Sequence, residues 1–184
     1  MRITKKEIAF EGNYLRIVRK FSKTGSKKEY IWETIERTNI YRRGAVVIIA
    51  LTKEKEVILE RNWRAPIETF VIQFPAGLTD REKESEEETA RRELLEETGY
   101  LARELTPIVT TPLCPALTPT EANHFLALDV DYIGKERKDS AEVIEVLKVP
   151  VEELTDFLLN LPEDTKLDLR VPGVLWVMEK KQLI

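Results

Sequence analysis

The chain has 184 residues, of which 42% are hydrophobic and 34% charged, with a formal net charge of −4. This length and composition are typical of one folded domain with room for a small appendage, and they exclude a disordered chain. The negative charge argues against a nucleic-acid partner, and no apolar stretch is long enough for a membrane partner. The single cysteine, Cys114, excludes a disulfide within the chain and predicts a cytoplasmic location.

Two runs with alternating apolar residues open the chain, at residues 14–18 and 30–35, with a turn cluster at 22–26 between them. This pattern predicts a β-hairpin. A hairpin alone buries too little surface to be stable, so it must pack on the rest of the chain or on a second copy. We therefore expect residues 1–41 to form a small N-terminal antiparallel sheet that serves dimerisation, and residues 42–184 to form the main domain.

The main domain begins with a continuous apolar run at residues 45–51, which predicts a strand buried on both faces. Ser85 and Glu88 have the spacing of a capping box, and Gly99 suits a left-handed helix end, so we expect a helix over residues 86–98. The fold class predicted is α+β, with a mixed sheet sandwiched between helices. Further strands are expected at 57–60, 70–74, 106–111, 124–131 and 142–149, and further helices near 151–160 and 172–181.

The predicted helix 86–98 carries an acidic face. Glu93, Glu96 and Glu97 are three and four residues apart, so their carboxylates share one side of the helix. Such a cluster suits a hard divalent cation such as Mg²⁺ or Mn²⁺. The alternative is a solvated acidic face balanced by Arg91 and Arg92.

The segment around this helix resembles the signature box of the Nudix hydrolases. The matching residues are Gly77, Glu84, Arg92-Glu93-Leu94 and Glu96-Glu97-Thr98-Gly99-Tyr100, with Tyr100 taken as the apolar position. One departure is that six residues, rather than five, separate Gly77 from Glu84. The resemblance implies a Nudix fold for residues 42–184.

The resemblance also implies roles for the residues of the box. Glu93 and Glu97 are expected to bind metal directly, Glu96 to bind metal or hold a metal-bound water, and the Ala76 carbonyl to complete the inner shell. Arg92 pairs with Glu84 and locks the loop to the helix, in support of catalysis.

The flanks resemble the ADP-ribose pyrophosphatases within this family. Trp32 stands where that subfamily stacks an aromatic ring on adenine, although a core or dimer-interface role suits it equally. Arg64 is expected to contact the diphosphate, since a guanidinium can grip phosphate oxygens, with a surface salt bridge as the alternative. Gln73 replaces the subfamily's usual glutamate. Pro115 lies in a loop similar to a substrate-binding loop, or it merely shapes a surface loop.

Hydrolysis needs a general base as well as metal. The only histidine, His124, lies beside apolar strand residues and is expected to be structural. Glu142 is the candidate for the catalytic base, because it resembles the late loop-to-strand segment from which ADP-ribose enzymes draw theirs. Glu145 and Glu121 are reserves, and the alternative is that all three are surface acids.

Together these features predict a Mg²⁺-dependent enzyme, with Mn²⁺ as a possible substitute, that hydrolyses ADP-ribose to AMP and ribose 5-phosphate. The first alternative is hydrolysis of another nucleoside diphosphate sugar, such as GDP-mannose or UDP-glucose. An alternative of a different class is a non-catalytic domain that senses ADP-ribose. The resemblance implies a homodimer in which the N-terminal sheet is exchanged between subunits.

Overall fold

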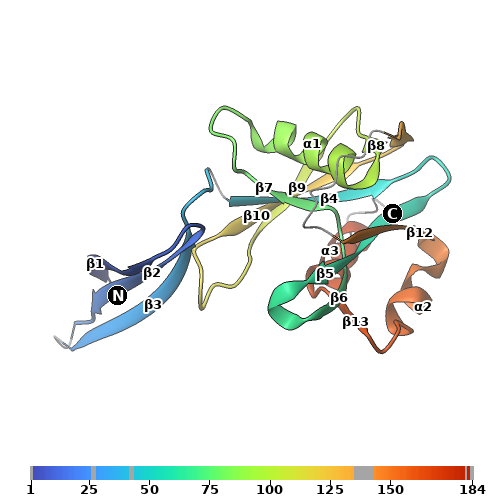
Figure 1. Cartoon of the computed structure of the whole chain (residues 1–184). Helices are drawn as coiled ribbons and strands as arrows, with labels where there is room; N and C mark the ends of the chain where they lie inside the picture. Colours follow the sequence, from blue (N-terminus) through green and yellow to red (C-terminus); the bar gives the residue numbers. More distant parts are fainter. Residues whose placement is uncertain (1, 26–27, 42–43, 135–142, 181, 183–184) are drawn as a thin grey trace.

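The computed structural model describes residues 2–25, 28–41, 44–134, 143–180 and 182. The N-terminal sheet and the main domain are separate in space, and the sheet projects to one side (Figure 1). The described helices include none that is long and apolar enough to cross a membrane.

The N-terminal sheet has three antiparallel strands in the order β1-β2-β3. They are β1 (Arg2–Glu11), β2 (Leu15–Lys23) and β3 (Glu29–Arg37). The hairpin predicted from the sequence is β2 and β3, while β1 was missed because its residues are almost all exposed and show no buried alternation. The sheet is joined to the main domain by hydrogen bonds from Ile35 N–H to the Leu117 carbonyl at 2.8 Å and from Tyr41 N–H to the Thr79 carbonyl at 2.7 Å.

The main domain is built on an eight-stranded mixed sheet. Its principal order is β13-β6-β5-β4-β10-β9, with β12 paired to β5 and β7 paired to β4. The sheet forks, because β5 pairs first with β4 and then, further along, with β6. The strands are β4 (Gly44–Leu51), β5 (Glu56–Arg64), β6 (Thr69–Gln73), β7 (Ala76–Leu78), β9 (Thr106–Pro112), β10 (Glu121–Ala127), β12 (Ile144–Pro150) and β13 (Thr165–Leu167).

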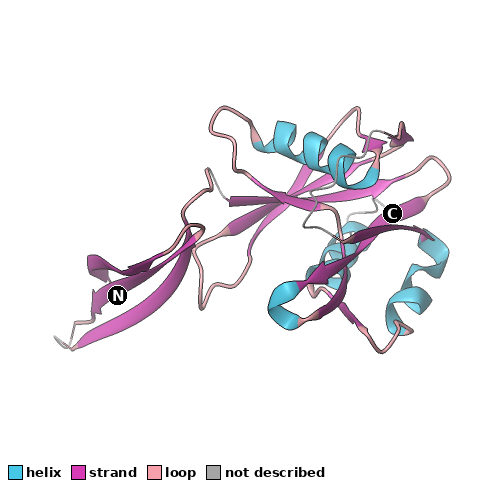
Figure 2. Ribbon diagram, in the orientation of Figure 1, coloured by secondary structure: helices cyan, strands magenta, loops and turns pink. Residues whose placement is uncertain are grey.

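Helices cover both faces of this sheet (Figure 2). On one face lies α1 (Glu86–Thr98), and on the other lie α2 (Leu154–Leu159) and α3 (Arg170–Lys180). Short elements complete the fold, namely the 3₁₀ turns η1 (Ala65–Ile67) and η2 (Val151–Glu153) and the two-stranded sheet of β8 (Tyr100–Leu101) and β11 (Asp131–Tyr132). The mixed sheet between helices that the sequence predicts is therefore confirmed.

Strand β4 joins two hydrophobic cores. All eight of its residues are buried, as expected from its continuous apolar run. Val47 and Ile49 face the core beneath α2 and α3, whereas Val46 and Ile48 face the core beneath α1. This alternation fixes the sheet between its two helical layers.

Helix α1 begins and ends where the sequence predicts. The Ser85 hydroxyl accepts from Glu88 N–H at 3.1 Å, and the Glu88 carboxylate accepts from Ser85 N–H at 2.7 Å. A cap of this kind stabilises a helix by about 1 kcal/mol. Gly99 ends the helix with a φ of 76°, a left-handed conformation that favours glycine.

His124 is buried on the β10 face that packs toward α3, which agrees with the structural role expected for it. Its Nδ1 lies 3.2 Å from the Val109 carbonyl. Burial, together with the nearby Arg170 cation, lowers the pKa of His124 below 6.5. The folded protein therefore holds this ring neutral more strongly than the unfolded chain does.

This burial predicts a pH dependence of stability. Because the folded pKa is depressed, the unfolded chain binds the additional proton, so the free energy of unfolding should fall as pH drops below about 6.5. The measurement is denaturant unfolding between about pH 8 and pH 5, comparing the native protein with His124→Leu. The variant should show a shallower fall in this range. An identical pH profile in both proteins would contradict a buried neutral His124.

Candidate active site

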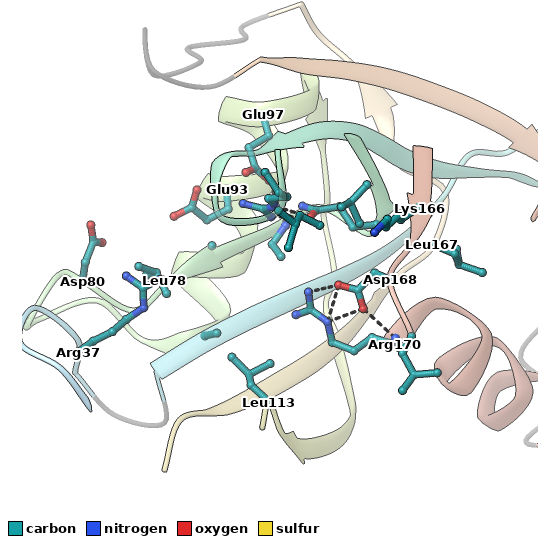
Figure 3. A pocket seen from close by; sticks show the side chains of 18 of the residues that line it. Arg37, Leu78, Asp80, Glu93, Glu97, Leu113, Lys166, Leu167, Asp168 and Arg170 are labelled. Atoms are coloured by element: carbon teal, nitrogen blue, oxygen red, sulfur yellow. Dashed lines mark hydrogen bonds and ion pairs between the residues drawn. The ribbon is translucent and has the colours of Figure 1, made fainter. Parts of the chain in front are cut away.

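A cavity of about 930 Å³ lies where the sheet forks. Its lining includes the acids in the C-terminal half of α1, the turn between β6 and β7, and the segment that joins β13 to α3 (Figure 3). Arg37 of the N-terminal sheet also reaches the lining. The cavity therefore collects side chains from parts of the chain that are far apart in sequence.

The acids of α1 are organised by Arg92. The guanidinium donates to Glu84 at 2.9 Å, to Glu93 at 2.8 Å and to Glu96 at 3.1 Å. Burial disfavours the Arg92 cation, but these carboxylates outweigh burial and raise its pKa. Its hydrogen bonds in turn lower the pKa of Glu84. The pairing of Arg92 with Glu84 is thus present as the resemblance implied, and Arg92 also holds two of the expected metal-binding acids.

Glu97 lies deepest among these acids. Its Oε2 accepts a hydrogen bond from Ala76 N–H at 3.1 Å, which ties the helix to the turn after β6. Burial raises the pKa of Glu97 well above its ordinary value, and the neighbouring Glu60 and Glu93 carboxylates raise it further. Burial likewise raises the pKa of Glu93. These groups would be ionised readily only beside a positive charge.

Gly77 allows the turn to approach the helix closely. A Cβ at this position would lie 2.1 Å from Cδ of Glu93, which is far inside contact distance. Any other residue would displace the Glu93 carboxylate. The box has a glycine here because a side chain would collide with the Glu93 side chain, and not because the backbone needs a positive φ angle.

The donor set fits a divalent cation in its chemistry. Several carboxylates and a backbone turn meet in a partly buried place, where burial, and then neighbouring carboxylates, raise the pKa values of Glu93 and Glu97. Among the described residues, however, no three acidic, cysteine or histidine side chains converge as a closed metal cage. Glu93 and Glu96 are held by Arg92 instead, so their carboxylates would have to turn from it toward a bound ion.

Arg64 lies in the cavity lining, as expected for a substrate contact. Its Nε donates to Oε1 of Gln73 at 3.0 Å. Gln73 in turn donates from Nε2 to Oε2 of Glu60 at 3.2 Å. Glu60 was missed in the sequence, where it simply follows the apolar residues of β5. The available signal was an acid within a strand that is otherwise buried.

The segment after β13 adds charged groups that the sequence did not predict. Arg170 donates from Nε to Asp168 at 2.9 Å, and both residues line the cavity (Figure 3). Burial opposes ionisation of Asp168, but Arg170 outweighs it and lowers the pKa of Asp168. Lys166 also reaches the lining. The sequence predicted no strand at β13, and the helix predicted near 172–181 gave no indication that this junction faces the acids of α1.

Other predicted site residues lie outside the lining. Trp32 is half-exposed on β3 of the projecting sheet. Pro115 lies in the loop that contacts this sheet through the Leu117 carbonyl, so the two predicted substrate elements adjoin. Glu142 lies outside the described residues. Glu145 is exposed and pairs with Arg61 at 3.6 Å.

Comparison with known proteins bears directly on this site. Residues 41–169 match the model of the NUDIX domain, and this span includes the whole signature box. An ADP-ribose pyrophosphatase of Bacillus subtilis is 34% identical over 119 residues, which cover 64% of each chain. The match thus spans just under two thirds of that relative's length. An ADP-ribose pyrophosphatase of Saccharomyces cerevisiae is 31% identical over 161 residues, covering 80% of this chain and 69% of the relative.

A solved structure supports the fold. The crystal structure of an ADP compounds hydrolase superposes with a TM-score of 0.80, covering 97% of this chain and 92% of that one, at 23% sequence identity. Nudix hydrolases generally use a divalent metal ion, which agrees with the chemistry of the acids on α1. The chain belongs to the Nudix hydrolase family.

Proposed function

We propose that this protein is a Mg²⁺-dependent hydrolase that cleaves the diphosphate of ADP-ribose to AMP and ribose 5-phosphate. The observation that carries the proposal is the presence of Glu93, Glu96 and Glu97 of the box in the lining of a cavity that also contains Arg64. Two relatives that are named ADP-ribose pyrophosphatases support the choice of substrate. Other nucleoside diphosphate sugars are the alternative, since the same acids and arginine would serve any diphosphate.

The metal-binding residues proposed are Glu93, Glu97 and the Ala76 carbonyl, with Glu96 as a ligand or as the holder of a metal-bound water. A divalent ion bound there lowers the pKa of a water and neutralises phosphoryl oxygens. The chain's own contribution begins with Arg92, which fixes the helix against the loop through Glu84. Mn²⁺ would satisfy the same oxygen ligands.

Arg64 is proposed to grip the diphosphate. Its guanidinium lines the cavity and donates to the neutral amide of Gln73. The positive charge therefore remains available to phosphate oxygens. Trp32 is proposed to stack on adenine, and Pro115 to shape the loop beside it.

Glu142 remains the proposed general base. The reserve Glu145 is exposed and paired with Arg61, and Glu121 is exposed at the start of β10. Neither reserve belongs to the cavity lining. A base must come within hydrogen-bond reach of the attacking water, so these positions argue against both reserves.

A homodimer is proposed from the N-terminal sheet. Ile8, Phe10, Ile31 and Trp32 of this sheet are each at least half exposed in the isolated chain. Exposed apolar side chains gathered on a projecting sheet are typical of a protein interface. Association through the sheet would also bring Trp32 to the cavity of the other subunit. The cytoplasmic location stays a prediction from the single cysteine.

The substrate assignment predicts a ranking of rates. With Mg²⁺ present, kcat/KM should be higher for ADP-ribose than for GDP-mannose or UDP-glucose. The measurement is the rate at which the nucleoside monophosphate forms from each substrate, side by side. Glu93→Gln should lower kcat by more than the roughly hundredfold that follows loss of an outer-shell partner. The matched control is Glu87→Gln on the exposed face of α1, which should retain activity. No cleavage of any substrate, with metal binding unchanged by Glu93→Gln, would refute an enzyme and favour a sensor.

The choice of base predicts unequal losses. Glu142→Gln should lower kcat by roughly 10²- to 10⁴-fold, as expected when a general base is removed. Glu145→Gln should change kcat little, because that carboxylate is exposed and paired with Arg61. Steady-state kinetics with ADP-ribose measures both. Equal losses in the two variants would remove the reason for choosing Glu142.

The dimer proposal predicts a mass. Light scattering should give twice the mass of one chain for the native protein, and Phe10→Lys combined with Ile31→Lys should give a monomer. Leu159→Lys is the matched control, since Leu159 is an even more exposed apolar residue, on α2 and away from the sheet. A native monomer, or a dimer that survives both lysines, would refute association through this sheet.

A further inference from the structure

Glu60 and Gln73 form a buried polar pair below the cavity. They are direct partners in the register of β5 and β6, and each is at most 2% exposed. Strands that pair in this way hold opposite side chains about 5 Å apart at Cβ. The two residues are thus fixed against each other by backbone pairing, and neither can turn toward solvent.

The amide of Gln73 is used at both ends. Its Oε1 accepts from Arg64 Nε at 3.0 Å and also from Arg64 Nη2. Its Nε2 donates to Glu60 at 3.2 Å. A side chain that lies between a cation and an anion in this way must accept from one and donate to the other. Among side chains of this length, only an amide does both with a neutral group.

Arg64 keeps donors free for a ligand. A guanidinium has five N–H groups in a planar fork, and Gln73 takes one from Nε and one from Nη2. The remaining donors, on a side chain that lines the cavity, can meet phosphate oxygens. Holding the guanidinium before substrate arrives lowers the entropy lost on binding.

The other end of the pair reaches the acids of α1. Glu60 lies close enough to Glu97 to raise the pKa of that acid, and Glu97 accepts from Ala76 N–H at 3.1 Å. Hydrogen bonds therefore run from Arg64 through Gln73 to Glu60, which lies beside the acid that holds the turn of the proposed metal site.

The geometry points to Gln73 as a positioning residue that holds Arg64 for the diphosphate, with Glu60 supplying from the paired strand the carboxylate that anchors the Gln73 amide. This inference rests on the proposed function, because it takes Arg64 as the phosphate contact. It assigns the amide and the acid as one exchangeable unit: either strand can carry the acid, provided that its partner carries the amide.

The first test removes the amide while keeping its length. Gln73→Met should weaken ADP binding about tenfold, measured by calorimetry in EDTA, because the Arg64 guanidinium loses the amide oxygen that holds it. KM for ADP-ribose should rise by a similar factor, with a smaller change in kcat. In an Arg64→Ala background, Gln73→Met should have no further effect on ADP affinity, since it acts through Arg64.

The second test exchanges the two groups. Gln73→Glu alone should weaken ADP binding and lower the melting temperature, because carboxylates at 60 and 73 would then face each other beside Glu97. The exchange variant, Glu60→Gln with Gln73→Glu, should recover both properties, since the amide would donate from the opposite strand. This variant also guards against misfolding, because it retains every hydrogen bond of the series.

The outcomes separate the two proposals. If Arg64→Ala leaves ADP affinity and KM unchanged, Arg64 is not the phosphate contact, and this part of the proposed function fails together with the inference. If Arg64→Ala weakens ADP binding but Gln73→Met does not, only the positioning role is overturned. An exchange variant no better than the sum of its single changes would refute the exchangeable unit.

Discussion

The crowding of glutamates around one backbone turn is the constraint on which the site depends. Glu97 is buried against the Ala76 amide, and Glu93 lies so close to Gly77 that no side chain fits there. Burial, and then the nearby carboxylates, raise the pKa values of Glu93 and Glu97, so both acids resist ionisation. The arrangement is held by Arg92, whose guanidinium contacts acids of both loop and helix, and it leaves a place whose electrostatics favour a cation.

Because the sheet forks, the turn at Ala76 and Gly77 lines the same cavity as Arg64, the proposed diphosphate contact. Strand β5 pairs first with β4 and then with β6. The chain passes from β6 to β7, which pairs with β4, through Phe74 and Pro75. The last residue of β6, Gln73, therefore stands beside Arg64 and Glu60, while the next strand begins at Ala76 beside α1. The proposed metal-binding acids and the arginine proposed to bind phosphate are brought together where the chain passes from β6 to β7.

Local interactions made α1 predictable to its exact ends. The capping box, the apolar positions at Ala90 and Leu94, and the glycine end all lie within fifteen residues, and each acts on its immediate neighbours. Strand β4 was equally clear, because burial on both faces demands a continuous apolar run. Strand β1 gave no such signal, since its charged and exposed residues are ordered by pairing with β2 rather than by a core. The predicted strand at 124–131 runs instead from Glu121 to Ala127, and Asp129 beyond it adopts a left-handed φ of 53°.

The sequence by itself determined the family, the acidic helix and the reaction class, because the signature box is a short pattern whose spacing reflects one helix and one turn. Only the tertiary structure decided that Glu60 lies against Gln73 and Glu97, and that Asp168 and Arg170 face the same cavity. Those contacts depend on strand register and on the packing of segments up to about a hundred residues apart, which no local pattern encodes. The acidic helix was visible at once, whereas the hydrogen bonds from Arg64 through Gln73 to Glu60 depend on the pairing of β5 with β6.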